Sequence, residues 1–548
     1  MKKIFLILFL FGLWNCTPKP SAEIVEAVKL NSLGFLPESV KEATITSPCS
    51  EFVVREAASG KVVFKDSVTG PVAQEDIGGE VWNADFSGVT TPGTYYLEVP
   101  AVGRSIDFPV GEKVYNDAYV TAMRGFYLWR CGMEVDGEHQ GNHYHQAACH
   151  LNDGYEDYLG KAGSRRDGTG GWHDAGDYGK YVVNAGVTVG VLFLAWEHFQ
   201  PQLEKISLNL PETAPGFPEF LKEIKWETDW LLKMQYADGS GRVSHKLTRV
   251  EFSSFIMADQ DSAKRYFTEW SSAATADFVA MMAQAARIFK PYDADYAATC
   301  LDAARVSYAF MKKNPEEKGF KQGDFKTGGY QTRDSDGRLW AAAEMWETTG
   351  EPEFLADFEK RAADRGFRID ENWDWGNKGN LGMFSYLLSN REGKDPAVRE
   401  ALVKNCLAVA EELVAKAQSD VYRRPLGGRY YWGCNGTVAR QTVNLFVANQ
   451  LQPDPKFVNT ALDAVGHLFG RNHYNRSFVT GIGINPPMKP HDRRSGADSV
   501  EAPWPGYLVG GGHKATDWVD LEESYSHNEI CINWQAPLVF ALAWFSQP

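Results

Sequence analysis

The chain has 548 residues, with 56 Lys and Arg against 71 Asp and Glu, and its formal net charge is −15. Hydrophobic residues make up 44% and charged residues 23%, which is typical of a soluble globular protein and excludes a disordered, collagen-like or multispan membrane protein. So acidic a chain is a poor match for nucleic-acid binding, since that affinity comes mainly from clustered Lys and Arg. The eight Cys are too few and too scattered for a disulfide scaffold.

Residues 1–21 are predicted to be an export leader and linker. Lys2 and Lys3 precede an apolar run over 4–14, which is too short to anchor the chain across a bilayer. Cys16 follows this run, as in bacterial lipoproteins, although residues 13–15 lack the usual small side chains. We expect export to the periplasm or cell surface, with a lipid anchor on Cys16. Cleavage of an ordinary secretory signal is the alternative.

Residues 22–112 show the alternating pattern of short β-strands. Apolar and polar residues alternate over 52–56, 61–65 and 93–99, and turn residues separate these runs. Short strands at this spacing predict a small β-sandwich of the immunoglobulin type. We find no cluster of catalytic residue types in this region.

Residues 113–548 have helical periodicity, with apolar residues three and four positions apart. The predicted helices are 115–130, 184–199, 217–236, 271–289, 295–313, 338–348, 352–364, 380–389, 396–417, 440–451, 456–469 and 528–545. Helices in this number, joined by long loops, indicate pairs arranged in a ring. We expect the Gly-, Trp-, Asp- and His-rich loops over 160–180, 421–437 and 472–527 to carry the function.

The loop over 170–181 contains two aspartates, Asp174 and Asp177, separated by small residues. If this turn is helical, the two carboxylates share one face, where each would perturb the pKa of the other. One could then hold a water molecule while the other orients it. The alternative is a simple turn or cap, since Asp and Gly favour both.

Glu529 is a second candidate for acid–base chemistry. Asn528 is predicted to cap the helix over 528–545, with Glu529 in the first turn and an apolar run after it. Partial burial would raise the pKa of Glu529 toward the range of a general acid, whereas the positive end of the helix would lower it. The sequence leaves these two effects open.

Three motifs resemble those of glycoside hydrolase family 9, which contains many endoglucanases. Residues 170–177 (GGWHDAGD) resemble the aspartate motif of the family, and residues 477–493 and 525–538 resemble its two signatures. The segment 31–37 (NSLGFLP) resembles the start of the immunoglobulin-like module that precedes some members. The resemblance implies a multidomain chain, with an immunoglobulin-like β-sandwich before an all-α (α/α)6 barrel that hydrolyses β-1,4-glucans with inversion.

The resemblance also assigns roles to residues of this chain. It implies that Asp177 is the general base, that Asp174 helps to hold the nucleophilic water and that Glu529 is the general acid. His491 and Arg493 would bind sugar hydroxyls. Such an enzyme needs its acid and base about 6.5–9.5 Å apart, on opposite sides of the scissile bond. We expect Tyr525 to line the same cleft, and Trp432 either to stack on a sugar ring or to serve in packing.

Two metal sites are further expectations. Cys131, Cys149, His150 and His173 match a zinc site found in relatives with the immunoglobulin-like module, and that zinc would brace the aspartate loop. Buried thiols and polar histidines without a metal are the alternative.

Calcium is the second expected metal, since the family often binds it. Asp334, Asp336 and Asp374 are the candidate ligands, although Gly337 stands where the family commonly has a carboxylate. An acidic turn without a cation is equally consistent with these residues.

The favoured function is therefore an inverting endo-β-1,4-glucanase that acts as a monomer on cellulose-like glucan, mixed-linkage glucan or xyloglucan. An exo-β-glucosaminidase is the first alternative, and it would need a further carboxylate, such as Glu501, Glu522 or Glu523, at a closed end of the cleft. A non-catalytic, glycan-binding surface lipoprotein is the second alternative, and the three intact carboxylates argue against it.

Overall fold

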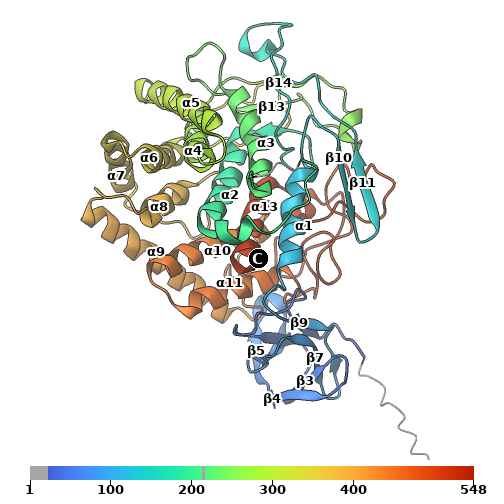
Figure 1. The fold of residues 1–548 in the computed structure, drawn as a ribbon. Coiled ribbons are helices and arrows are strands. Elements are labelled where there is room, and N and C mark those ends of the chain that lie inside the picture. The colour runs from blue at the N-terminus through green and yellow to red at the C-terminus, as the bar shows by residue number, and fades with distance from the viewer. Residues whose placement is uncertain (1–22, 213–215) are drawn as a thin grey trace, which may run out of the picture.

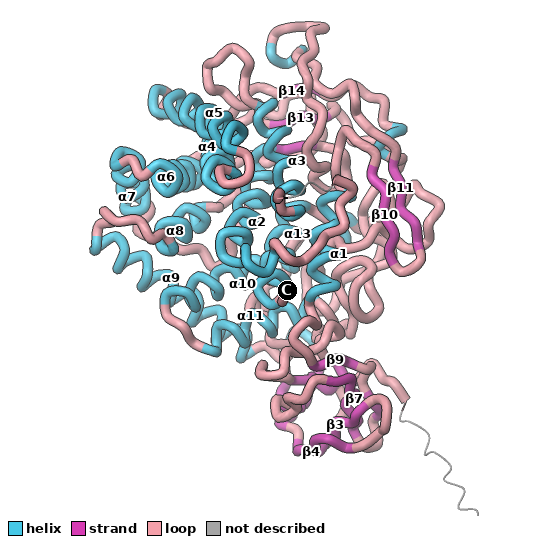
Figure 2. Tube along the Cα trace, in the orientation of Figure 1, coloured by secondary structure: helices cyan, strands magenta, loops and turns pink. Residues whose placement is uncertain are grey.

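A computed structural model describes residues 23–212 and 216–548 as a small β-structured region attached to a large helical one (Figures 1 and 2). The predicted leader and Cys16 lie outside the described residues. The immunoglobulin-like sandwich followed by an (α/α)6 barrel, as the sequence predicted, is confirmed.

The β-structured region consists of two antiparallel sheets packed face to face. One has the strand order β1-β2-β6-β5 and the other β4-β3-β7-β8, with β9 also paired to β7. Phe35, Phe86 and Phe108 form an aromatic cluster in the buried core of this region. The strands are β1 (Val28–Lys29), β2 (Glu42–Ile45), β3 (Glu51–Glu56), β4 (Val62–Ser67), β5 (Thr69–Gln74), β6 (Gly79–Asp85), β7 (Gly93–Val99), β8 (Gly103–Arg104) and β9 (Phe108–Val110).

Six helices of the described chain form an inner ring: α2 (Val182–Leu203), α4 (Ser272–Phe289), α6 (Ser335–Thr349), α8 (Gly379–Leu388), α10 (Cys434–Leu451) and α13 (Ile532–Phe545). Neighbours pack in chain order, and α13 packs against α2, which closes the ring. The inner helices are buried on nearly all sides. By length and composition α2 could cross a membrane, but here it is a buried core helix.

The outer helices cover this ring and bury one face only. They are α1 (Asn116–Leu128), α3 (Glu219–Met234), α5 (Ala294–Lys313), α7 (Pro352–Asp364), α9 (Pro396–Ser419) and α11 (Pro455–Leu468). Each carries charged residues on its exposed side, as expected for an amphipathic helix at a protein surface. The sequence predicted all twelve positions, with ends within a few residues for most of them.

The predicted helix over 528–545 is wrong at its start. A short helix, α12 (Tyr525–Asn528), ends directly before Glu529, and α13 begins only at Ile532. Residues 529–531 are extended because their backbone pairs with other loops: Glu529 with His491, Ile530 with Val509, and Cys531 with Ala175. The predicted capping of a helix by Asn528 is therefore wrong as well.

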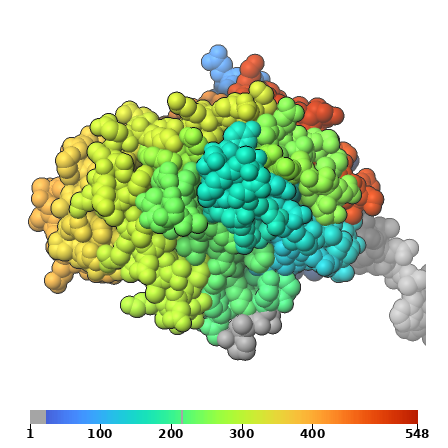
Figure 3. All heavy atoms as spheres, turned by 90° about the horizontal axis from the view of Figure 1, so that it is seen from above, coloured from blue at the N-terminus to red at the C-terminus, as the bar shows by residue number. Residues whose placement is uncertain are grey.

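Short β-elements and loops cover the end of the barrel where the inner helices begin. They include the hairpin β10 (Val135–His139) and β11 (Asn142–Gln146), and a sheet of β12 (Lys180–Tyr181), β13 (Lys246–Thr248) and β14 (Tyr266–Phe267). Viewed from above, the blue-green part of the chain that precedes α2 lies over green segments of the helical region (Figure 3). These loops carry most of the candidate site residues.

Candidate active site

A cleft of about 380 Å³ opens at the N-terminal ends of the inner helices. Its wall brings together Asp174, Asp177 and Glu529, which are up to 355 positions apart in the sequence. Aromatic side chains make up much of the remaining wall: Tyr181, Phe252, Tyr330, Trp375, Trp432 and Trp534. Such a cleft combines groups for proton transfer with flat apolar surfaces for sugar rings.

The aspartate loop is a series of bends rather than a helical turn. The expectation that Asp174 and Asp177 share one helix face depended on a helical turn, so it does not apply. The backbone N–H of Asp174 donates to the carbonyl of Gly179 at 3.0 Å, which folds the loop back on itself. A Cβ at Gly176 would lie 1.9 Å from the carbonyl oxygen of His491, so only glycine fits there. This close approach places the loop against the segment that pairs with Glu529.

Asp174 is fully buried and accepts two short hydrogen bonds. Tyr330 donates its hydroxyl at 2.6 Å to one carboxylate oxygen, and Asn184 donates its amide at 2.7 Å to the other. Burial and the charge of Asp177 raise the pKa of Asp174 to about 8, against these two bonds, which favour the ionised form. The aspartates therefore do not ionise independently.

Asp177 accepts hydrogen bonds on a single carboxylate oxygen. The donors to Oδ2 are the backbone N–H of Gly179 at 3.1 Å and the hydroxyl of Tyr181 at 3.2 Å. In the described part of the chain no partner is found for its other oxygen, Oδ1, and Asp177 lines the cleft. This carboxylate is therefore placed to accept a proton from a molecule in the cleft.

Glu529 lines the same cleft and is partly exposed to it. Burial of its carboxyl group and the charges of Asp177 and Asp174 raise its pKa well above the usual range, against Arg493 and a hydrogen bond from Trp432. Glu529 is not in the first turn of a helix, so the opposing effect of a helix N-terminus does not arise. The question that the sequence left open is decided in favour of the raised pKa.

His491 and Arg493 belong to a segment that contacts both the aspartate loop and the residue Glu529. The Arg493 guanidinium donates to the backbone carbonyls of Gly176 at 2.7 Å and Ser253 at 3.0 Å. The His491 Nδ1 lies 2.7 Å from the carbonyl oxygen of Glu522. Both side chains therefore make contacts with the backbone of the site loops, which leaves a role in binding sugar hydroxyls as a prediction.

Trp432 and Tyr525 form an exposed aromatic pair beside Glu529. They are 47% and 53% exposed, unusual for such large rings, and their ring centroids are 5.3 Å apart at an interplanar angle of 63°. Trp432 lines the cleft, and its indole favours the ionised form of the Glu529 carboxylate. Packing alone does not account for Trp432, because almost half of its surface is open to solvent.

Sequence reasoning missed several side chains of this site. Asn184, Tyr330 and Phe252 lie outside the recognised motifs, and only folding brings them to the aspartates. Tyr181 closes the aspartate motif and could have been found from that position. None of Glu501, Glu522 and Glu523 is among the residues that line the cleft, and the further carboxylate found there, that of Asp374, pairs with Arg440.

The four predicted zinc ligands form a buried cluster behind the aspartate loop, with their ligand atoms all within 4.8 Å of one another. The Nδ1 of His150 lies 3.7 Å from the sulfur of Cys131 and 3.4 Å from the Nε2 of His173, which is 3.8 Å from the sulfur of Cys149. Tetrahedral zinc with these ligands has edges of about 3.3–3.8 Å. The donors and their spacing therefore fit a structural metal ion.

Asp334, Asp336 and Asp374, the predicted calcium ligands, each pair with an arginine. Asp334 pairs with Arg338 at 2.7 Å, Asp336 pairs with Arg365, and Asp374 pairs with Arg440 at 2.5 Å. Among the described residues, the only group of metal-ligating side chains is the Cys and His cluster. Each of these carboxylates is neutralised by an arginine and they are not gathered as one ligand group, so calcium binding by this set stays a prediction.

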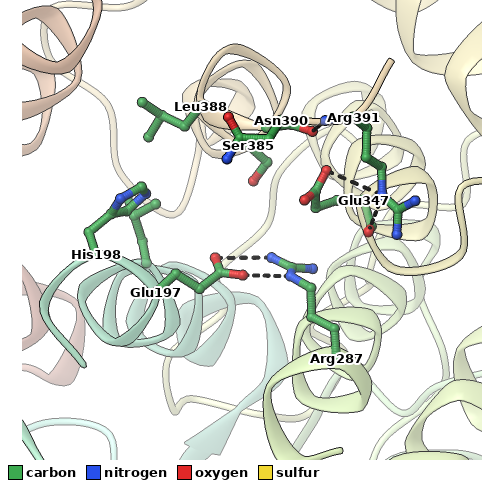
Figure 4. Close-up of a pocket in the computed structure, with 10 residues that line it drawn as sticks. Glu197, His198, Arg287, Glu347, Ser385, Leu388, Asn390 and Arg391 are labelled. Carbon is green, nitrogen blue, oxygen red and sulfur yellow. Dashed lines mark hydrogen bonds and ion pairs between the residues drawn. The ribbon is translucent and has the colours of Figure 1, made fainter. Parts of the chain in front are cut away.

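A second cavity, of about 530 Å³, lies at the opposite ends of α2, α4, α6 and α8 (Figure 4). Its charged side chains pair with each other: the Arg287 guanidinium donates to both carboxylate oxygens of Glu197, and Arg391 faces Glu347. Carboxylates engaged in this way are poor candidates for proton transfer to a substrate. The chemistry is therefore assigned to the first cleft.

Comparison with known proteins agrees with this geometry. Residues 115–542 match the family model described as Glycosyl hydrolase family 9, and residues 24–104 match that of the Cellulase N-terminal ig-like domain. Endoglucanase D of Acetivibrio thermocellus is 55% identical over 521 residues, covering 94% of this chain and 83% of the relative. A xyloglucan-specific endo-beta-1,4-glucanase of Bacteroides ovatus is 32% identical over 581 residues, covering 98% and 97%.

Among solved structures, a Zn-binding triple mutant of the family 9 endoglucanase J30 superimposes with a TM-score of 0.87 at 32% identity, covering 93% of this chain and 99% of that one. The sequence motifs, the closed ring of helices and these likenesses agree over nearly the whole described chain. The chain belongs to glycosyl hydrolase family 9.

Proposed function

We propose that this protein is an inverting endo-β-1,4-glucanase. The observation that carries the proposal is that Asp174, Asp177 and Glu529, from distant parts of the sequence, all line one cleft. The endoglucanases among its relatives support the same reaction. An open cleft with aromatic walls suits internal cleavage of a long β-glucan chain.

In the proposed mechanism, Glu529 protonates the glycosidic oxygen while Asp177 takes a proton from the attacking water. The raised pKa of Glu529 keeps its proton available near neutral pH. The Oδ1 atom of Asp177 is the site for the water proton, since Oδ2 already accepts from Gly179 and Tyr181. Asp174, fixed by Tyr330 and Asn184, would hold the same water on its other side. Water attack opposite the leaving group inverts the anomeric carbon.

The test is to follow hydrolysis by NMR over a panel of cellulose oligomers, mixed-linkage glucan, xyloglucan and chitosan oligomers. We expect α-anomers to appear first from a β-1,4-glucan, with a rapid fall in polymer viscosity that indicates internal cleavage. A β-anomer as the first product would overturn inversion. Turnover of chitosan oligomers alone would favour the exo-β-glucosaminidase instead.

We also propose that the Cys and His cluster holds one structural zinc ion. Two thiolates and two imidazoles are soft and borderline ligands that suit zinc, and four protein ligands leave no open position for a substrate. His173 directly precedes Asp174, so this cluster would brace the aspartate loop from behind. Elemental analysis of protein purified without chelators should find one zinc per chain, and a content near zero would overturn the assignment.

Finally, we propose that the protein is exported and tethered through a lipid on Cys16. The basic, apolar and Cys-containing leader supports this proposal. Radiolabelled palmitate should be incorporated by the full-length chain and not by a Cys16→Ser variant. Equal labelling of the two would contradict it. A soluble, unlabelled wild-type protein would favour an ordinary secretory signal.

A further inference from the structure

A buried lysine, Lys246, lies behind the aspartate loop. It belongs to β13, and the antiparallel register places it directly opposite Tyr181 on β12. Lys246 is 0% exposed, although a charged side chain is rarely buried without a charged partner. Tyr181 hydrogen-bonds Asp177, so a positive charge buried next to Tyr181 acts on the candidate active site.

The ammonium group of Lys246 is held entirely by uncharged oxygens. It donates to the carbonyl of Gly328 at 2.7 Å, the hydroxyl of Thr327 at 3.1 Å and the amide oxygen of Gln322 at 3.2 Å. The described residues place no carboxylate within 4.0 Å of this group. Two other buried lysines, Lys180 and Lys378, each pair with an aspartate. The positive charge of Lys246 is therefore not cancelled locally.

A continuous path of hydrogen bonds leads from this ammonium to Asp177. The carbonyl oxygen of Thr327 accepts from Lys246 at 3.4 Å, and the N–H of the same peptide group, that of Gly328, donates to the Tyr181 hydroxyl at 3.1 Å. That hydroxyl then donates to Oδ2 of Asp177 at 3.2 Å. Hydrogen bonds in such a series polarise one another, so the charge at one end strengthens the donor at the other.

The charges of Lys246 and Asp177 stabilise each other. Burial lowers the pKa of Lys246 to about 7, and the negative charge of Asp177 opposes this shift. A cation stabilised by Asp177 must in turn favour the ionised form of Asp177. The other charged or titratable groups that act around Asp177 are Asp174, Tyr181, His491 and Glu529, together with Arg493, which donates to the carbonyl of Gly176. The negative charges of Asp174 and Glu529 oppose the ionisation of Asp177, so cations such as Lys246 must favour it.

We propose that Lys246 is a positioning residue of the reaction: its buried ammonium orients Tyr181 toward Asp177, and its charge favours the ionised base that accepts the water proton. This inference rests on the proposed function, because it names what maintains the base of that mechanism. Lys246 itself is fully enclosed and does not touch the substrate.

The experiment measures the pH dependence of kcat/KM on a soluble β-glucan for wild type, Lys246→Met and Lys246→Gln. Without the cation the ionised form of Asp177 is less favoured, so the limb on which activity is lost as pH falls should move up by about one unit. We expect kcat at pH 5 to fall roughly tenfold or more, with little change in KM. Glutamine keeps a hydrogen-bond donor without the charge, so it should give the same shift with a smaller loss of kcat.

The matched control is Lys29→Met. Lys29 is a buried lysine of the β-sandwich that also donates to a backbone carbonyl, that of His473, and lies outside the cleft. Its pH profile should match that of the wild type. A folded Lys246 variant that loses activity equally at all pH values, with an unmoved acid limb, would show a merely structural role and overturn the inference.

Tyr181→Phe breaks the same path without changing Lys246, and it keeps the test open if the Lys246 variants do not fold. If the path acts through Tyr181, this variant should also move the acid limb up. Lys246→Gln should then shift the acid limb less in the Tyr181→Phe background than it does in the wild type. No shift in the folded Tyr181→Phe protein would overturn the path. A wild-type protein inactive on all β-glucans would instead refute the proposed function.

Discussion

Two segments bring the carboxylates to the cleft, and they are built in different ways: residues 174–177, called here the aspartate wall, and residues 529–531, called the Glu529 wall. The aspartate wall is deeply buried, adjoins the Cys and His cluster through His173, and receives five hydrogen bonds on Asp174 and Asp177 together, one of them from the Cys531 thiol. The Glu529 wall is a three-residue extended segment between two helices, and its neighbours Trp432 and Tyr525 are about half exposed. We infer that the first wall fixes the water, whereas the second accommodates sugar rings. Each prediction below alters one of these walls.

The largest effect is expected from removing the acid or the base. Glu529→Gln and Asp177→Asn should each lower kcat on a natural β-glucan by about 10²–10⁴-fold, since positioned proton transfer contributes that much. On an aryl cellobioside with a good leaving group, Glu529→Gln should recover much of its activity, because that bond needs no proton. Asp177→Asn should not recover.

The different responses of the two variants to a better leaving group distinguish the acid, Glu529, from the base, Asp177. Both variants should bind cello-oligosaccharides nearly as the wild type does, which isothermal titration can check. If the two variants respond alike to the better leaving group, the assignment of acid to one wall and base to the other is wrong.

Removing the metal should weaken only the aspartate wall. Asp261 lies 3.6 Å from the Nε2 atom of His150 and would hold this ring with its Nδ1 toward the metal. Asp261→Asn should therefore lose zinc to a competing chelator about 10–100-fold more readily. The metal-depleted protein should unfold at a lower temperature, because a ligand that binds the folded state stabilises it.

Competition with a chromophoric chelator and calorimetry measure these two effects. Asp334→Asn is a suitable control, since that aspartate pairs with Arg338 and lies outside the cluster. If Asp261→Asn retains zinc as tightly as the wild type, the carboxylate does not support His150.

A smaller effect is expected at the hydrogen bond from Tyr330 to Asp174. Tyr330→Phe removes a donor at 2.6 Å from a buried carboxylate, a loss of about 1.5 kcal/mol that corresponds to roughly tenfold in rate. Because Tyr330 acts on the water-holding residue, kcat should fall while KM stays nearly constant. A rise in KM at constant kcat would show that Tyr330 binds a sugar directly.

The sequence predicted the fold well and singled out three carboxylates that the structure brings to one cleft, for physical reasons. Helical periodicity reports burial, which decides where helices lie, and the Asp and Glu motifs are short continuous segments. What it missed depends on contacts between distant segments. Residues 529–531 are extended because three other loops pair with them, and Asp374 is neutralised by Arg440, 66 positions later. Neither partner can be identified from local pattern.

The smallest effect concerns the acid wall and its pH dependence. Glu529 must be protonated to act, so activity should fall as pH rises through its raised pKa. The indole of Trp432 favours the ionised carboxylate and so holds this pKa lower than burial alone would. Trp432→Phe keeps an aromatic ring but removes the donor, and the alkaline limb of kcat/KM should therefore move up by about half a unit. Trp375→Phe, in the same cleft, should leave this limb in place. A downward movement in the Trp432 variant would mean that the indole stabilises the protonated acid and therefore raises, rather than lowers, the pKa of Glu529.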